Sequence, residues 1–400
     1  MALFPLDRKT KFLLLVGMMV LSIAAVPHLP FNAPWGVDLQ NVHAFQKCAA
    51  GRSPYLIDAA VCGDVQNRAF YYPPFLFAFF RWVRPLNFET TMYIWTAFLL
   101  TATSASFYLW ARKISKEPLG DHWHEVVTFC GLLMFQYPFV FALERGNTDT
   151  VNVVLYTLGA LLFVRGRQWW GGMAAGVAAG FKLSPIMAII VMTGALLIGW
   201  RRVGKWAWLR FSGGSLTAFV LTLVVFPRDA KIYMFDVLPK YAKFLTYISE
   251  YSHSLPTFVG GDWRGYAKLM SAALLAPWVW GMGRAVQRGD LAMAFAGAMA
   301  VSTYVQGTSF DYNLVTVFPF LLLLFLEARR TDKWGLLVFG VFAIVGDRRL
   351  FTTPNSSIFT PTFHLVVELA FLVIAALSIG RDRDDFPAAP APPSEPTAAT

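Results

Sequence analysis

Residues 169–200 read WWGGMAAGVAAGFKLSPIMAIIVMTGALLIGW, and Lys182 is the single charged residue among them. At about 1.5 Å per residue, such a run is long enough to cross a hydrocarbon core about 30 Å thick. It forms two spans only if Lys182–Pro185 breaks it, because proline removes a helix hydrogen bond and disfavours the helical region before it. A single kinked or re-entrant passage is the alternative. The small residues of Gly171–Gly180, and those of Ala292–Ala300, suit close helix packing rather than lipid contact.

The composition of the whole chain also indicates a bilayer. Of its 400 residues, 56% are hydrophobic and 14% are charged, whereas soluble domains carry about 25% charged residues. The net charge of +10 comes from basic groups in short connections between apolar runs, among them Arg112 with Lys113, Arg165 with Arg167, Arg201 with Arg202, Arg284 with Arg288, and Arg329 with Arg330. These groups occur at every second connection between predicted spans. One trace therefore places all of them in the cytoplasm, as the positive-inside rule requires. The charge is therefore topological, and without a basic stripe interleaved with aromatics it does not indicate nucleic-acid binding.

These patterns predict an all-α polytopic membrane protein with about twelve transmembrane helices and both termini in the cytoplasm. The candidate spans are 12–27, 90–110, 124–143, 148–164, 169–181, 185–200, 208–227, 266–283, 291–308, 313–328, 334–346 and 363–380. Residues 1–380 form one transmembrane domain, with large extracytoplasmic loops at 28–89 and 228–265. Residues 381–400 end in a low-complexity run, which predicts a disordered cytoplasmic tail.

The three cysteines fall in two settings. Cys48 and Cys62 both lie in the first outside loop, where an oxidising compartment allows a disulfide that would stiffen the loop. Two free thiols are the alternative. Cys130 lies inside a predicted span, where it is expected only to pack, and the chain has no zinc-type cysteine spacing.

Motifs of soluble enzymes are absent from the sequence. It contains no P-loop, no dinucleotide-binding glycine fingerprint, no H-E-x-x-H and no G-x-S-x-G, which argues against an ATP-driven pump. Polar and aromatic residues gather instead in the segments predicted to lie outside. The candidates for catalysis and substrate binding are Asp38, His43, Tyr55, Tyr71, Tyr72, Arg145, Asn147, Lys182, His253, Arg264, Arg348 and Arg349.

This set suits the transfer of a sugar from a lipid-linked phosphate. A carboxylate such as Asp38, just past the first span, can remove a proton from an attacking hydroxyl as a general base. Arginine and lysine neutralise a phosphate, and aromatic rings stack on sugar faces and line the entry of an isoprenoid chain. Because these cations can offset the charge of the departing phosphate, neither a metal nor a cofactor is expected.

Several motifs resemble those of glycosyltransferase family 87, a family of the GT-C superfamily of integral membrane transferases. They are D-L at Asp38, G-R-S-P-Y at 51–55, F-Y-Y-P-P at 70–74, E-R-G-N-T-D at 144–149, R-G-R at 165–167 and F-K-L-S-P at 181–185. The resemblance covers about residues 30–190. It implies a GT-C-like bundle and a polyprenyl-phosphate-mannose-dependent mannosyltransferase or a related arabinofuranosyltransferase, with Asp38 as the catalytic base of an inverting transfer.

The sequence therefore predicts an enzyme of the plasma or inner membrane, with its active site on the extracytoplasmic side. It would transfer a sugar, with mannose the first candidate, from a polyprenyl-phosphate donor to a lipid or glycan acceptor. A flippase or secondary transporter for a lipid-linked sugar is the main alternative. Transporters place polar groups at the midplane on broken helices, often in internal repeats, whereas here the polar groups gather on the outer face.

Each candidate also has a structural interpretation. Asp38 could be a helix cap or the member of a loop salt bridge, and His43 could be a satisfied loop histidine rather than a sugar contact or proton relay. Arg145 could pair with Glu144 or Asp149 instead of a phosphate, and Lys182 could snorkel toward the interface.

The remaining candidates are aromatic, histidine and basic side chains of the predicted outside segments. His253 could line the donor site, and Tyr71 and Tyr72 could be aromatic platforms near it. Arg264 could bind the donor phosphate or only anionic headgroups, and the same ambiguity applies to Arg348 with Arg349.

Overall fold

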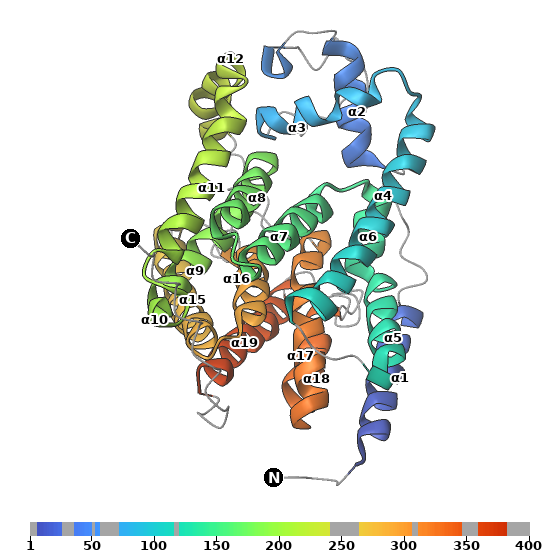
Figure 1. The fold of residues 1–400 in the computed structure, drawn as a ribbon. Coiled ribbons are helices and arrows are strands. Elements are labelled where there is room, and N and C mark those ends of the chain that lie inside the picture. Colours follow the sequence, from blue (N-terminus) through green and yellow to red (C-terminus); the bar gives the residue numbers. More distant parts are fainter. Residues whose placement is uncertain are drawn as a thin grey trace.

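The computed structural model describes residues 6–25, 36–49, 53–56, 72–115, 120–240, 264–305, 311–345 and 359–381. Within these ranges every regular element is a helix and no strand occurs, which confirms the all-α prediction. Figure 1 shows the helices as an elongated bundle. The helices that coincide with predicted spans are α1 (Arg8–Ala25), α4 (Phe88–Tyr108), α7 (Asp149–Val164), α8 (Gln168–Phe181), α9 (Pro185–Ile198), α11 (Ala207–Val224), α15 (Arg264–Gln287), α16 (Leu291–Val305), α17 (Phe318–Thr331), α18 (Trp334–Val345) and α19 (Phe359–Arg381).

The lengths of the described helices support fewer spans than the sequence predicts. Two helical stretches, Phe88–Ile114 and Ala207–Val224, are long and apolar enough to cross a membrane. The first of these consists of α4 and the π-helical turn η5 (Leu109–Ile114) that continues it. Other apolar helices, including α7, α9 and α16, are shorter than a full crossing. The helical membrane fold is therefore supported, and the count of twelve spans stays a prediction.

The predicted span 124–143 is not one continuous helix. It is divided into α5 (Trp123–Met134) and α6 (Tyr137–Arg145), which are bent by 54° relative to each other, and the two together are apolar enough for one broken span. Gln136, between them, has an extended backbone, and Pro138 lies in the first turn of α6. Proline there fits a new helix start but cannot continue the preceding helix, because it lacks the N–H that the ladder needs.

The predicted break at Lys182–Pro185 is confirmed. Helix α8 ends at Phe181, Lys182 is extended with φ −153° and ψ 142°, and α9 begins at Pro185. The apolar run 169–200 is thus divided between α8 and α9 and is not one continuous passage.

The glycines of α8 allow a close approach to α11, as the sequence predicts. A Cβ atom added to Gly172 would lie 2.0 Å from the carbonyl oxygen of Phe211, and one added to Gly176 would lie 2.1 Å from that of Ser215. The two backbones therefore touch where side chains would keep them apart. Helix α16 is buried from Ala292 to Val305, so the small residues of Ala292–Ala300 also pack against helices.

The stretch predicted as the first outside loop contains helices. They are α2 (Val37–Ala49), the 3₁₀ turn η1 (Pro54–Leu56), α3 (Pro74–Phe79) and the 3₁₀ turn η4 (Phe80–Val83). Asp38 therefore lies in the first turn of a helix and not on a loop. The reason is that Leu39, Val42 and Phe45 recur every three residues, which places them on one helical face.

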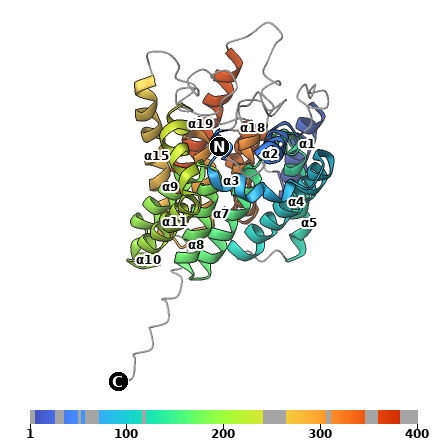
Figure 2. The same cartoon turned by 90° about the horizontal axis from the view of Figure 1, so that it is seen from above.

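This face of α2 is buried at one end of the bundle. It packs with Leu76 and Phe80 of the α3–η4 segment and with Trp95 of α4 in one apolar cluster. Figure 1 shows α2 and α3 at the upper end of the molecule, and Figure 2 looks onto that end. The second predicted loop, 228–265, also begins helically, with α12 (Pro227–Ile232) and the π-helical turn η7 (Tyr233–Val237). Residues 241–263 of that loop and the predicted tail from 382 onward lie outside the described residues.

Candidate active site

The turn between α6 and α7 contacts the start of α2. Gly146 ends α6 in the left-handed conformation with φ 64°, and its carbonyl accepts a hydrogen bond from the indole nitrogen of Trp95 at 3.2 Å. A Cβ on Gly146 would lie 2.7 Å from Cβ of Leu39, so only glycine lets α2 come this close. The backbone N–H of Gly36 donates to the carbonyl of Glu144 at 2.6 Å. The start of α2 is thereby fastened to the end of α6.

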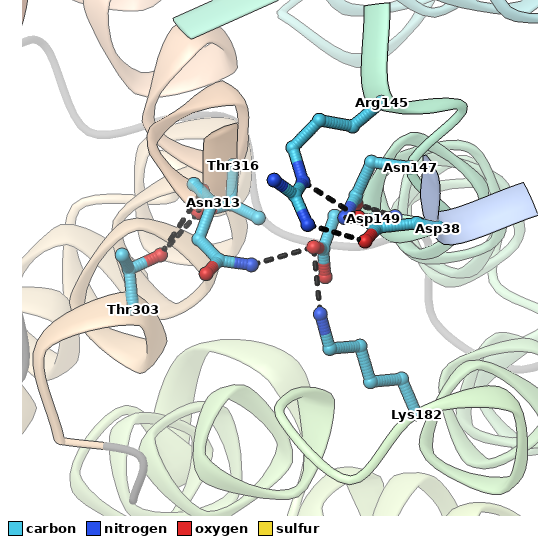
Figure 3. Close-up of polar contacts among 8 residues, drawn as sticks. All are labelled: Asp38, Arg145, Asn147, Asp149, Lys182, Thr303, Asn313 and Thr316. Carbon is cyan, nitrogen blue, oxygen red and sulfur yellow. Dashed lines mark hydrogen bonds and ion pairs between the residues drawn. The ribbon is translucent and has the colours of Figure 1, made fainter. Parts of the chain in front are cut away.

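Asp38 is held by two side chains of this turn (Figure 3). Arg145 donates from Nη2 to Oδ1 at 2.7 Å and from Nε to Oδ2 at 3.1 Å, which is a bidentate ion pair. Asn147 donates from Nδ2 to Oδ2 at 2.9 Å. The Asp38 and Arg145 side chains are 12% and 17% exposed, so the pair is largely enclosed but can be reached from outside. The alternative interpretation of Asp38 as a salt-bridge residue is therefore a structural fact, whatever its chemical role.

A second and deeper ion pair lies beside the first. Lys182 donates to Oδ2 of Asp149 at 2.7 Å, and Asn313 of the 3₁₀ turn η10 (Asp311–Val317) donates to the same oxygen at 2.5 Å. The Asp149 side chain is 1% exposed and that of Lys182 is 21% exposed. In this structure Lys182 thus has a carboxylate partner, and Arg145 pairs with Asp38 rather than with Glu144 or Asp149.

The two pairs form one electrostatic unit. Asn147 connects them, because its Oδ1 accepts the backbone N–H of Asp149 at 2.7 Å while its Nδ2 donates to Asp38. Asp38 and Asp149 each lie in the first turn of a helix, and Arg145 lies in the last turn of α6. The helix dipoles favour each of these charges. Two carboxylates and two cations leave the cluster formally neutral.

Three further candidates from the segment predicted as the first outside loop are described, and each contacts protein groups. His43 is buried; its Nε2 donates to the carbonyl of Leu86 at 3.0 Å, and its ring meets Phe88 edge to face. The Tyr55 hydroxyl donates to the carbonyl of Tyr72 at 2.6 Å. Burial lowers the pKa of His43 and raises the pKa of Tyr55. These contacts connect different parts of this segment to one another.

The other candidates cannot be placed relative to the site. Tyr71, His253, Arg348 and Arg349 lie outside the described residues, and α15 begins at Arg264 without a described side chain there. Cys48 is disulfide-bonded and Cys130 is a free, partly buried thiol. The predicted partner Cys62 lies outside the described residues, so the pairing of Cys48 with Cys62 stays a prediction.

Sequence reasoning missed the roles of Asp149 and Asn313. The sequence offers Asp149 as a possible partner of Arg145, and Asn313 is not among its candidate site residues. A signal for the Asp149–Lys182 pair was present, because Asp149 begins one apolar helix and Lys182 directly follows the next. In a helical hairpin these positions lie at the same end. Asn313, 164 residues from Asp149, offered no comparable signal.

The apolar helices support a helical membrane protein, in which the two ion pairs form an enclosed charged cluster. Residues 70–310, more than half of the chain, match the model of glycosyltransferase family 87, and the chain belongs to this family. Arg145, Asn147, Asp149 and Lys182 lie inside the matched range, and Asp38 precedes it. The resemblance noted in the sequence is thereby confirmed.

The chain is also similar to a curated mycobacterial enzyme. It is 25% identical, over 94% of this chain and 88% of the relative, to a polyprenol-phosphate-mannose-dependent alpha-(1-2)-phosphatidylinositol pentamannoside mannosyltransferase of Mycobacterium tuberculosis (strain CDC 1551 / Oshkosh). Family membership and the apolar helical fold together make this chain a membrane glycosyltransferase.

Proposed function

We propose that the chain transfers a sugar, with mannose the first candidate, from a polyprenyl-phosphate donor to the hydroxyl of a lipid or glycan acceptor, and that Asp38 is the general base. The observation that carries the proposal is the geometry of Asp38. It is an enclosed but accessible carboxylate, oriented by Arg145 and Asn147, in a member of a glycosyltransferase family. The donor class comes from the mycobacterial relative, which depends on polyprenol-phosphate-mannose.

The proposed step balances without a further reactant. The acceptor oxygen forms a bond to the anomeric carbon of the donor sugar as the bond from that carbon to the phosphate oxygen breaks. The hydroxyl proton passes to the carboxylate of Asp38, and the polyprenyl phosphate leaves with the electron pair of the broken bond. Attack from the face opposite the phosphate inverts the anomeric configuration.

Arg145 suits the departing phosphate because a guanidinium binds carboxylate and phosphate oxygens with the same fork. It lies within hydrogen-bond distance of the proposed base, so the acceptor hydroxyl and the donor phosphate would meet beside one residue pair. Lys182 is a less direct candidate because it faces the buried carboxylate of Asp149.

The distribution of charge supports an extracytoplasmic site. Helix α2 lies at one end of the bundle, and the start of α1 and the short basic helix α10 (Trp200–Val203) lie toward the other end (Figure 1). Because basic connections favour the cytoplasmic side, Asp38 would face outward in a multi-pass protein of the plasma or inner membrane. This orientation also suits a lipid-linked donor rather than a nucleotide sugar.

The decisive measurement is sugar transfer by purified protein in detergent. Polyprenyl-phosphate-mannose carrying a radiolabel is incubated with candidate lipid acceptors, and the labelled product is separated by chromatography. Asp38→Asn should lower transfer about 100-fold or more, the range that general-base catalysis contributes. Product formed without a membrane gradient would exclude a pure transporter or flippase. A polyprenyl-phosphate-arabinofuranose donor in parallel tests the related sugar class.

A matched control is available at a distant ion pair. Asp332 pairs with Lys11 at 2.7 Å, so Asp332→Asn makes the same chemical change and also breaks a salt bridge. Its transfer rate should stay within about two-fold of wild type, since exposed pairs contribute little. A folded Asp38→Asn protein with the transfer rate of the control would contradict the role of Asp38.

A further inference from the structure

The two carboxylate oxygens of Asp38 have unequal surroundings. Oδ2 accepts two hydrogen bonds, from Nε of Arg145 and Nδ2 of Asn147, whereas Oδ1 accepts one, from Nη2 of Arg145. Within the part of the chain that the structure describes, these three contacts are the hydrogen bonds of the side chain. A carboxylate oxygen has two lone-pair sites. Oδ2 is therefore filled, and one site of Oδ1 remains.

The amide of Asn147 can point in only one sense. Its oxygen accepts the backbone N–H of Asp149, so its NH₂ group must face Asp38. Its own backbone N–H donates to the carbonyl of Ala142 at 2.8 Å. Asn147 is fully buried, so a substrate cannot reach it while the site has this arrangement.

The residue behind Asn147 is itself anchored. Asp149 contacts Lys182 at the α8–α9 break and Asn313 on η10. The hydroxyls of Thr303 and Thr316, which contact each other, are both bonded to the carbonyl of Asn313 and hold that turn in place (Figure 3). The position of the Asn147 amide is thus fixed by helices that are remote from α2 in the sequence.

We propose that Asn147 is a positioning residue, which occupies Oδ2 of Asp38 and leaves Oδ1 as the oxygen that takes the proton of the acceptor hydroxyl. This inference rests on the proposed function and changes one assignment made from the sequence, because Asn147 then acts on the base and not on the substrate. The physical reason is that an acceptor hydroxyl can donate only to a lone pair that is not already used. Asn147 thereby determines the face of the carboxylate at which the acceptor binds.

Two substitutions test the hydrogen bond from the Asn147 amide to Asp38 separately from the structure of the α6–α7 turn. Asn147→Ala removes the amide entirely. Asn147→Asp keeps an oxygen that can accept the Asp149 N–H but removes the donor to Asp38 and adds a like charge beside it. Both variants should lower kcat roughly 10- to 100-fold, the range that a misplaced catalytic group costs, with KM for polyprenyl-phosphate-mannose unchanged.

A pH–rate profile gives a readout that a merely structural role would not move. The ionised carboxylate loses a donor that stabilises it, so the acid limb of kcat/KM should move to higher pH in both variants. The shift should be larger for Asn147→Asp because a like charge opposes ionisation. A thermal unfolding transition shows that each variant is folded. If Asn147→Ala does not yield folded protein, the test is made with Asn147→Asp alone.

Asn87→Ala is the matched control. Asn87 caps α4 by accepting the N–H of Thr90 at 2.7 Å, so this variant also loses an asparagine hydrogen bond without touching Asp38. Its kcat and acid limb should equal those of wild type.

Two results would overturn the inference. One is a folded Asn147 variant with the wild-type acid limb and kcat, and the other is a rise in donor KM with kcat unchanged, which would return Asn147 to substrate binding. Either result, combined with loss of transfer in Asp38→Asn, leaves the proposed function intact. Retained transfer in Asp38→Asn would instead contradict the proposed function itself.

Discussion

The chemistry open to each residue of the candidate site depends on the side chains that it contacts. Asp38 and Arg145 were each selected from the sequence for separate tasks, as a base and as a phosphate ligand. The structure shows them as a bidentate pair between residues 107 positions apart. Under the proposed function, this pair would orient the base and would also place a cation beside the donor phosphate, so one contact would serve both tasks.

His43 gives a residue-level prediction about stability. Burial lowers its pKa below the ordinary value of 6.5, its bond to the Leu86 carbonyl opposes this, and the nearby Lys47 lowers the pKa further. As the pH falls through 6.5, the unfolded chain therefore takes up the proton before the folded one does. The stability that neutral His43 contributes is full above that pH and is lost as the pH falls toward the lower folded pKa.

The measurement is thermal unfolding in detergent at pH 7.5 and pH 5.5. The decrease in Tm between these pH values should be smaller in His43→Gln than in wild type, because glutamine can donate to Leu86 but does not titrate. His124 is exposed, so His124→Gln should retain the full wild-type decrease. An equal decrease in all three proteins would show that His43 has no part in the pH dependence.

At the scale of elements, the contact between α8 and α11 depends on glycines, which have no side chain to separate the two backbones. Gly176 of α8 meets the backbone of α11 so closely that an added Cβ would lie 2.1 Å from the Ser215 carbonyl. Gly176→Ala should therefore separate the two helices and lower the unfolding free energy by about 1–3 kcal/mol, the usual cost of overpacking.

The control for this prediction is another helical glycine. Gly131 in α5 has nothing within 4 Å of an added Cβ. Gly131→Ala should be neutral or stabilising by about 0.5–1 kcal/mol because alanine has the higher helix propensity. The measurement is the unfolding free energy of the two variants from chemical denaturation. A Gly176→Ala protein as stable as Gly131→Ala would contradict the close approach of α8 to α11.

At the scale of the whole molecule, the ion pair of Asp149 and Lys182, together with Asn313, connects segments that are distant in the sequence. Asp149 joins the start of α7 to the α8–α9 break and to η10, so three segments meet at one carboxylate. Lys182→Met or Asp149→Asn should each lower the unfolding free energy by about 3 kcal/mol, because each removes one charge of an ion pair whose carboxylate is buried.

The charge-balanced double variant completes this test. Asp149→Asn combined with Lys182→Met should lose clearly less stability than the sum of the two single variants, since no uncompensated charge remains. The equivalent cycle at the exposed Lys11–Asp332 pair should show near additivity. Additive losses at Asp149 and Lys182 would mean that the two charges do not stabilise each other.

Much of the fold was predictable because its signals are local. An apolar run, a proline and a basic turn lie within a few residues of one another, so the helix boundaries at Phe181 and Pro185 follow from the sequence. The bend between α5 and α6 was missed, although Pro138 marks it, because the run 124–143 reads as continuously apolar. Helix α2 was missed because it is short and follows an apolar helix in a polar-looking segment.

Less of the site was predictable. The sequence identified Asp38, Arg145, Asn147 and Lys182 as members, and the E-R-G-N-T-D and F-K-L-S-P motifs indicated the family. It did not indicate which residue contacts which. Asp149 and Asn313 were overlooked as anchors because a buried polar residue is recognised only when its burial is known.

By itself, the sequence determined a helical membrane protein of glycosyltransferase family 87, because hydropathy, proline breaks and short motifs are properties of neighbouring residues. Only the tertiary structure decided that Asp38 pairs with Arg145, that Asn147 links this pair to Asp149, and that Asp149 reaches Lys182 and Asn313. These contacts join residues up to 164 positions apart. The left-handed Gly146 lets α2 approach the α6–α7 turn, and such an approach between distant segments cannot be read from the order of neighbouring residues.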